Sequence, residues 1–265
     1  MFWVRFRSSV ILMAITLAVI ILGGDVLFTV VLGISIIGMT ELYKTTKLQK
    51  TPLGIIGYIA AVGFFFMLRF GLTEYNTFLF IGFLLALMIL YVIRYPKYRV
   101  EEVTAVFFGL FYVTVMLSFI YQVRMLESGF YIVWLIFIGA WGSDTSAYCV
   151  GMLFGKHKNF TSLSPKKSIE GCIGGVIGAA LIGFLYALII RNRITGFDNI
   201  GPIFALISAT ASVISQLGDL AASAIKRNHD IKDYGTLIPG HGGILDRFDS
   251  IIFVAPIVYF MATIL

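Results

Sequence analysis

The chain has 265 residues, of which 59% are hydrophobic and 13% charged, and its mean hydropathy is +0.94. Soluble domains are about 45–50% apolar and about 25% charged, so this composition excludes a water-soluble globular protein. The formal net charge is +6, and in a membrane protein a basic excess is typical of cytoplasmic loops beside anionic lipid. We therefore expect a membrane protein with no nucleic-acid partner.

Apolar runs long enough to cross a bilayer, roughly 20 residues each, recur along the whole chain. Stretches such as Val10 to Leu22 are apolar on every face, which excludes a β-barrel because barrel strands alternate polar and apolar residues. The first run follows Arg5 and Arg7 and resembles a signal peptide, but no small-residue cleavage site follows it, so we expect it to remain as a membrane helix. The sequence predicts an all-α, polytopic integral membrane protein.

Glycine, proline and charge clusters divide the chain into about nine predicted transmembrane helices. These cover about residues 8–22, 25–42, 53–70, 76–94, 103–122, 130–153, 169–190, 200–224 and 247–265. With alternating loops, only four of the 20 Lys and Arg fall on the side away from the N-terminus, namely Arg69, Arg124, Arg191 and Arg193. Basic residues accumulate on the cytoplasmic side. We therefore expect a cytoplasmic N-terminus, with the two most basic loops, about 154–168 and 225–246, facing the cytoplasm.

The two halves of the chain differ in character. Residues 1–125 carry few ionisable groups and are expected to form scaffold and lipid-facing helices. Residues 126–265 hold most of the intramembrane carboxylates, most of the glycines and both long polar loops, so they are expected to carry the catalytic helices. Since no flexible linker separates the halves, we expect 1–265 to be one membrane domain.

The eighth predicted helix carries a polar stripe. Six polar residues follow at steps of three and four, which places them on one helical face: Ser208, Ser212, Ser215, Asp219, Ser223 and Lys226. Serines alone also serve helix packing. A carboxylate at membrane depth costs about 2.5–3.5 kcal/mol and generally faces a cavity or a partner, so Asp219 is a functional candidate.

Three further carboxylates lie in this half of the chain. Asp144 sits among small residues in the run WGSDTSAY, and Asp246 and Asp249 share a face at the start of the ninth predicted helix. Buried hydrogen bonding for Asp144 and helix capping for the other two are the structural alternatives. Carboxylates gathered from separate helices suit Mg²⁺ held together with substrate phosphates, whereas no His or Cys cluster suits zinc.

The two basic loops supply candidate phosphate-binding groups. Ser164, Lys166 and Lys167 precede the seventh predicted helix, whose N-terminus could bind phosphate, although positive-inside bias alone could also explain the lysines. The second loop contains His241, which could equally be a turn residue. It also contains Gly242 and Gly243, whose backbone could approach an anion. The glycines of the seventh helix, in contrast, predict close helix packing: Gly171, Gly174, Gly175 and Gly178.

The string SAIKRNHDIKDYGTLIPGHGGILDRFD, from Ser223 to Asp249, resembles the signature of the phosphatidate cytidylyltransferase, or CDP-diacylglycerol synthase, family. Asp144 with Ala147, Tyr148, Gly151 and Gly155, and the segment Ser164 to Gly171, resemble two more family segments. The chain departs from the family pattern at Ile169, where Trp is usual, and at Ser168, where Thr is common. The motifs cover roughly the last half of the chain.

The resemblance implies an enzyme that condenses CTP with phosphatidic acid to give CDP-diacylglycerol and pyrophosphate, using Mg²⁺. The metal ligands it implies are Asp219 and Asp246 first, with Asp144 and Asp249 as further or indirect ligands. The expected catalytic residues are Asp144, Lys167, Asp219, Lys226 and Asp246. The expected substrate-binding residues are Ser164, Lys166, Ser223, Arg227, Lys232, His241, Gly242, Gly243 and Arg247.

Two other functions compete with this interpretation. A related enzyme could transfer phosphate from CTP to a polyprenyl alcohol of the dolichol type, and intramembrane Asp and Lys also build transporters. Against a transporter, the charges gather in the last four helices, and no glycine-interrupted pair repeats in the two halves. The resemblance further suggests a homodimer. Because the basic loops are expected on the cytoplasmic side, we expect an inner-membrane protein in contact with membrane lipid, whose active site faces the cytoplasm.

Overall fold

The computed structural model describes residues 2–158, 163–165, 167–194, 199–240 and 242–265. These residues are mostly helical, and within them the only β-type pairings are two isolated bridges. The expected all-α class is therefore confirmed. The chain divides into two compact units, one formed by Met1–Ser118 with Ile231–Arg247 and the other by Phe119–Asp230 with Phe248–Leu265.

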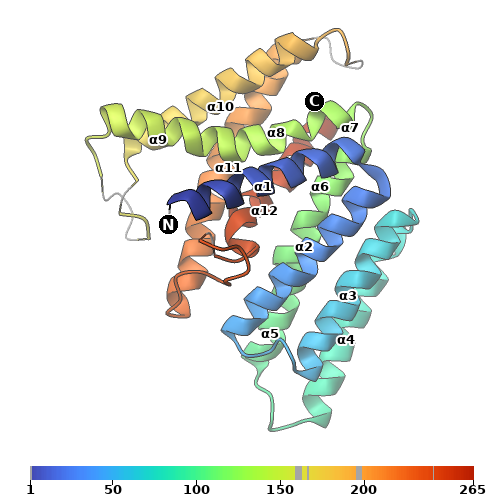
Figure 1. The fold of residues 1–265 in the computed structure, drawn as a ribbon. Helices are drawn as coiled ribbons and strands as arrows, with labels where there is room; N and C mark the ends of the chain where they lie inside the picture. The colour runs from blue at the N-terminus through green and yellow to red at the C-terminus, as the bar shows by residue number, and fades with distance from the viewer. Residues whose placement is uncertain (1, 159–162, 166, 195–198, 241) are drawn as a thin grey trace. The chain divides into compact units, whose positions relative to one another are not determined.

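The first unit contains the N-terminal helices. These are α1 (Phe2–Leu22), α2 (Gly24–Thr45), α3 (Pro52–Arg69), the 3-10 turn η1 (Thr73–Tyr75), α4 (Asn76–Ile93), α5 (Val100–Gly109) and the π-turn η2 (Leu110–Val115). α3 and α4 lie side by side (Figure 1). Tyr43 on α2 is fully buried and donates its hydroxyl to the carbonyl of Val106 on α5 at 2.8 Å.

The second unit contains the remaining helices. These are most of α6 (Met116–Met125), α7 (Gly129–Ile132), α8 (Trp134–Phe137), the π-turn η3 (Ile138–Gly142), α9 (Ser143–Phe154), α10 (Ile169–Ile190), α11 (Ile200–Asn228) and most of α12 (Leu245–Ile264). α10 packs along both α9 and α11. Figure 1 shows α9 and α10 running alongside one another.

The glycine face of α10 lies against α9. A Cβ atom added at Gly174 would collide with the side chain of Val150, and one at Gly178 with Ser146. At Gly175 it would lie 3.2 Å from Ala147. The packing role predicted for these glycines is therefore confirmed, because the two helices approach too closely for larger side chains.

Local signals set several helix starts. Thr51 accepts a hydrogen bond from the amide of Gly54 at 3.2 Å and Pro52 follows it, which is a favoured start for α3. Ser168 caps α10 in the same manner, accepting from Gly171 at 3.1 Å.

The described residues contain seven helices that are long and apolar enough to cross a membrane. The apolar part of α1, Val10–Leu22, is shorter than these seven. The segment predicted as one span over 130–153 is instead divided into α7, α8, η3 and α9. The chain is a polytopic helical membrane protein, while the count of nine spans, the cytoplasmic N-terminus and the single-domain organisation stay predictions.

Candidate functional site

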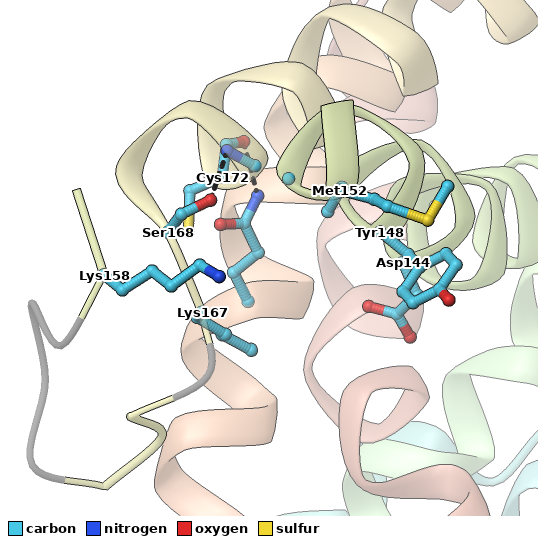
Figure 2. Close-up of a pocket in the computed structure, with 11 residues that line it drawn as sticks. Asp144, Tyr148, Met152, Lys158, Lys167, Ser168 and Cys172 are labelled. Carbon is cyan, nitrogen blue, oxygen red and sulfur yellow. Dashed lines mark hydrogen bonds between the residues drawn. The ribbon is translucent and has the colours of Figure 1, made fainter. Parts of the chain in front are cut away.

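A pocket of about 440 Å³ lies in the second unit. Its walls come from α9, α10, α11 and the segment before α10. The residues that line it are Asp144, Ala147, Tyr148, Gly151, Met152, Lys158, Lys167, Ser168, Gly171, Cys172 and Gln216. Figure 2 shows Lys158 and Lys167 on one side of the view and Asp144 on the other. Apolar walls with a few converging polar groups are typical of small-molecule sites.

An ion pair at this pocket joins Lys167 to Asp219. The Lys167 Nζ lies 2.5 Å from the Asp219 Oδ2, with 27% of the lysine and 34% of the aspartate side chain exposed. Asp144 lies close enough for both charges to act on its carboxylate. Asp144 on α9, Lys167 in the segment before α10 and Asp219 on α11 were expected to act together, and they lie close to one another.

Asp144 follows an irregular stretch of backbone. Asp144 is the second residue of α9, which begins directly after the π-helical segment η3. Asp144 is exposed. Short π-helical segments inside α-helices often occur at functional sites. Behind Asp144, the hydroxyl of Ser143 is fully buried and lies 2.7 Å from that of Ser212 on α11.

Contacts between residues 157–158 and 168–170 join the two ends of the segment that carries Lys158 and Lys167. These joined ends are called the base of the segment. The amide of Ile169 donates to the carbonyl of His157 at 3.1 Å, and His157 Nδ1 lies 2.5 Å from Glu170 Oε1. Lys158 and Ser168 form an isolated antiparallel bridge. Since Ser168 also caps α10, the start of the helix and the base of this segment are fixed by the same few residues.

The polar stripe of α11 is present as predicted, because the helix is unbroken from Ile200 to Asn228. Ser208, Ser212 and Ser215 are fully buried. At the other end of the stripe, Lys226 Nζ lies 4.0 Å from Asp249 Oδ2, with only 13% and 14% of the two side chains exposed.

In the first unit, Asp246 organises the loop that precedes it. Asp246 is buried, and its Oδ2 accepts hydrogen bonds from the amides of Tyr234 at 2.8 Å and Gly243 at 2.9 Å. Gly242 has φ +85°, a conformation that side chains rarely adopt. A Cβ there would also lie 2.8 Å from the Asp246 carboxylate. Gly242 therefore has a structural reason to be glycine, alongside the predicted approach to phosphate.

The predicted site residues fall into both units. The first unit holds Lys232, Gly242, Gly243, Asp246 and Arg247; the second holds Asp144, Ser164, Lys167, Asp219, Ser223, Lys226, Arg227 and Asp249. Lys166 and His241 lie outside the described residues. Lys232 and Arg227 are exposed, while Ser223 is half-buried.

Three residues at these places had not been singled out from the sequence. Lys158 and Gln216 line the pocket, and Glu41 on α2 is bonded to the loop of the first unit. Gln216 stands four residues after Ser212 and three before Asp219, so the helical spacing of the stripe could have found it. Glu41 is an acidic residue inside an apolar run, which is itself a signal of function.

The donor chemistry of the pocket suits Mg²⁺ in one respect. Mg²⁺ is usually held by one or two carboxylates together with substrate phosphates, and Asp144 and Asp219 supply two carboxylates at one place. Within the part of the chain that the structure describes, no group of three or more His, Cys, Asp or Glu is arranged to hold a metal. The four-aspartate magnesium site stays a prediction.

Comparison with known proteins identifies relatives over nearly the whole chain. The chain is 31% identical to a phosphatidate cytidylyltransferase of Bacillus subtilis over 260 residues, covering 95% of this chain and 94% of the relative. It is 32% identical to one of Staphylococcus haemolyticus over 258 residues, covering 96% of both. One of Thermotoga maritima is 36% identical over 170 residues, covering 64% of this chain and 63% of the relative.

The resemblance read from the sequence motifs is thereby confirmed, and it extends well beyond the half of the chain that carries them. The sequence model of the cytidylyltransferase family matches residues 3–265. The polytopic helical fold, the charged pocket and this match agree: the chain is a nucleotidyltransferase and belongs to the cytidylyltransferase family.

Proposed function

We propose that this enzyme is a phosphatidate cytidylyltransferase, which converts CTP and phosphatidic acid to CDP-diacylglycerol and pyrophosphate. The observation that carries the proposal is the pocket beside the Lys167–Asp219 pair, in a chain that two relatives with this name match over 95% and 96% of its length. The pocket offers both cationic and carboxylate groups, and both are needed where two phosphate-bearing substrates meet.

In the proposed reaction, an oxygen of the lipid phosphate attacks the α-phosphorus of CTP. A new P–O bond forms, the bond between the α- and β-phosphates breaks, and pyrophosphate leaves with the electron pair. The attacking group is already an anion, so the enzyme needs no strong general base. Its main tasks are to align the two phosphates and to stabilise the charge of the leaving group.

The cationic side chains serve the second task. We assign Lys167 to a substrate phosphate, and Lys226, Arg227, Lys232 and Arg247 to the triphosphate and the departing pyrophosphate, since charge-assisted hydrogen bonds are the strong ones. Lys167 forms an ion pair with Asp219. On binding, a substrate phosphate would therefore compete with Asp219 for the ammonium group.

Asp219 and Asp246 remain the first proposed metal ligands, with Asp144 and Asp249 as further or indirect ligands. Of these four, Asp144 and Asp219 are the two carboxylates found at the pocket of the second unit. When bound, Mg²⁺ would neutralise part of the phosphate charge and orient the phosphates. Lys167 Nζ, which pairs with Asp219, would keep that carboxylate oriented until a substrate phosphate takes the ammonium group. The basic residues also support our expectation that the site opens to the cytoplasm at the inner membrane, where both a soluble nucleotide and a lipid can reach it.

Label tracing on the detergent-purified full-length enzyme tests the proposal. The assay supplies Mg²⁺, phosphatidic acid and CTP labelled at either the α- or the γ-phosphorus. We expect α-label in the lipid product and γ-label in pyrophosphate. Asp219→Asn and Asp246→Asn should lose this transfer, whereas Asp25→Asn, which alters an exposed pair with Arg69, should retain it.

The same assay, repeated with a polyprenyl alcohol in place of phosphatidic acid, distinguishes the alternative enzyme. If γ-label enters a polyprenyl alcohol and CDP is released, the protein is a CTP-dependent polyprenol kinase and the proposal is wrong. If wild-type enzyme in a folded preparation turns over neither lipid, the transporter interpretation replaces both.

A further inference from the structure

Glu41 on α2 is a buried carboxylate in an apolar helix. Only 3% of the residue is exposed, and α2 is one of the seven candidate membrane spans. A buried charge is costly unless it is paired or hydrogen-bonded, and an acidic group within a membrane span is expected to have a functional or structural partner. The partner of Glu41 is therefore the first question.

The partner is backbone more than 200 residues away in the sequence. The amide of Ile244 donates to Glu41 Oε1 at 3.1 Å, and the amide of Leu245 donates to Oε2 at 2.8 Å. α12 begins at Leu245, and the first amides of a helix have no acceptor within the helix. Glu41 thus caps α12 from another helix, using both of its carboxylate oxygens.

The loop before α12 is shaped to receive this side chain. Added Cβ atoms at Gly235 and Gly243 would both collide with the Glu41 carboxylate; the one at Gly243 would lie 2.5 Å from its two oxygens. Two separate points of the loop therefore approach Glu41 so closely that a side chain at either one would displace the carboxylate.

Glu41 and Asp246 together accept the hydrogen bonds that hold the loop. Asp246 accepts from the amides of Tyr234 and Gly243, and Glu41 accepts from the next two amides, those of Ile244 and Leu245. Three consecutive amides are thus held by two buried carboxylates. The segment 231–247, here called the Glu41 loop, also carries Lys232 and Arg247, the residues assigned above to the CTP phosphates.

We propose that Glu41 is a positioning residue, which fixes the Glu41 loop so that its basic side chains bind the triphosphate of CTP. The inference rests on the proposed function for its kinetic consequence, but not for its structural one. Glu41 acts through the loop and has no assigned contact with a substrate.

Glu41→Gln is the main test because it keeps the size of the side chain. The glutamine side chain has one acceptor oxygen and one NH₂ donor in place of two acceptor oxygens. One of the two backbone amides therefore loses its acceptor and faces the NH₂ group instead. Hydrogen exchange measured by mass spectrometry on the full-length protein should show at least tenfold faster exchange in peptides covering 234–245. Gly235→Ala, which intrudes on the carboxylate from the loop side, should give the same change without altering α2.

Ser35→Ala is the matched control, since Ser35 is fully buried on the same helix but lies nearly two turns from Glu41. It should leave exchange in the Glu41 loop at the wild-type rate. If Glu41→Gln and Gly235→Ala also leave it unchanged, the positioning role is wrong.

Kinetics supply the second measurement. Glu41→Gln should raise the KM for CTP at least tenfold and leave the KM for phosphatidic acid within twofold. General loss of fold would reduce the active fraction, and hence kcat, without separating the two KM values. Equal changes in both KM values would overturn the assignment to CTP. If wild type has no such activity, the proposed function fails, while the exchange measurement still decides the role of Glu41.

Discussion

Lys167 and Asp219 form an ion pair of 2.5 Å although they stand 52 positions apart in the sequence. The lysine ends the basic segment before α10, and the aspartate lies on the polar stripe of α11. Their pairing joins the two features that the sequence had marked separately, the phosphate-binding loop and the intramembrane carboxylate. It also means that neither group is available to a substrate without affecting the other.

The first prediction concerns this pair. Lys167→Met and Asp219→Asn should each lower kcat by roughly 10²–10³, the usual loss when one preorganised electrostatic group is removed. The double variant should lose little more than the worse single variant, because groups that act as a unit are not additive. Measured turnover of the four proteins gives the coupling.

Lys156→Met is the control for this series, since Lys156 is an exposed lysine near the start of the same segment and does not line the pocket. It should keep turnover within about twofold of wild type on that ground. Losses that simply multiply in the double variant would mean that Lys167 and Asp219 act independently.

The second prediction concerns the buried pair of Lys226 and Asp249. Lys226→Met removes one partner of a pair whose side chains are only 13% and 14% exposed, which should cost about 3 kcal/mol and lower the apparent Tm by roughly 6–12 °C. Adding Asp249→Leu should restore most of the loss, because an apolar pair can replace a buried ion pair. Thermal unfolding in detergent measures both changes.

Lys232→Met, at an exposed lysine, provides the stability control and should leave the Tm unchanged. A Tm for Lys226→Met equal to that of this control would show that the 4.0 Å contact contributes nothing to stability.

Sequence patterns predicted what depends on neighbours along the chain. Each predicted span corresponds to helical residues, because apolar runs and caps such as Thr51 act locally. The polar face of α11 and the glycine face of α10 also followed from a period of 3.6 residues. Once the helix forms, the spacing of these residues determines the face on which they lie.

Contacts between distant segments could not be predicted in the same way. The π-turn η3 divides the expected sixth span just before Asp144, and no residue pattern known from the chain specifies such a turn. Glu41 was visible as an acid in an apolar run, but its partners Ile244 and Leu245 contribute only backbone amides. Backbone amides are identical in every sequence, so only the folded structure identifies them.

The third prediction concerns the base of the segment before α10. Glu170→Gln weakens the contact with His157, which is largely exposed. Because exposed ion pairs contribute little to global stability, the Tm should stay close to wild type. Limited trypsin digestion should nevertheless cleave faster after Lys158 or Lys167, since the base of the segment opens more often.

Glu127→Gln, at an exposed acid elsewhere in the second unit, should leave the digestion rate unchanged. Equal cleavage of the two variants would show that the other contacts at the base, such as the Ile169–His157 hydrogen bond, hold the segment without Glu170.

The last prediction concerns the glycine face of α10. Alanine normally stabilises a helix interior relative to glycine, by about 0.5–1 kcal/mol. Gly82→Ala on α4 should follow this rule, because a Cβ there meets nothing within 4 Å. Gly174→Ala should have the opposite sign, since its Cβ collides with Val150 and overpacking costs about 1–3 kcal/mol. Adding Val150→Ala should relieve the collision and raise the Tm of the Gly174→Ala protein. A Gly174→Ala variant that is as stable as Gly82→Ala would mean that α9 and α10 can separate at no cost, and the pocket they share would then have no rigid wall.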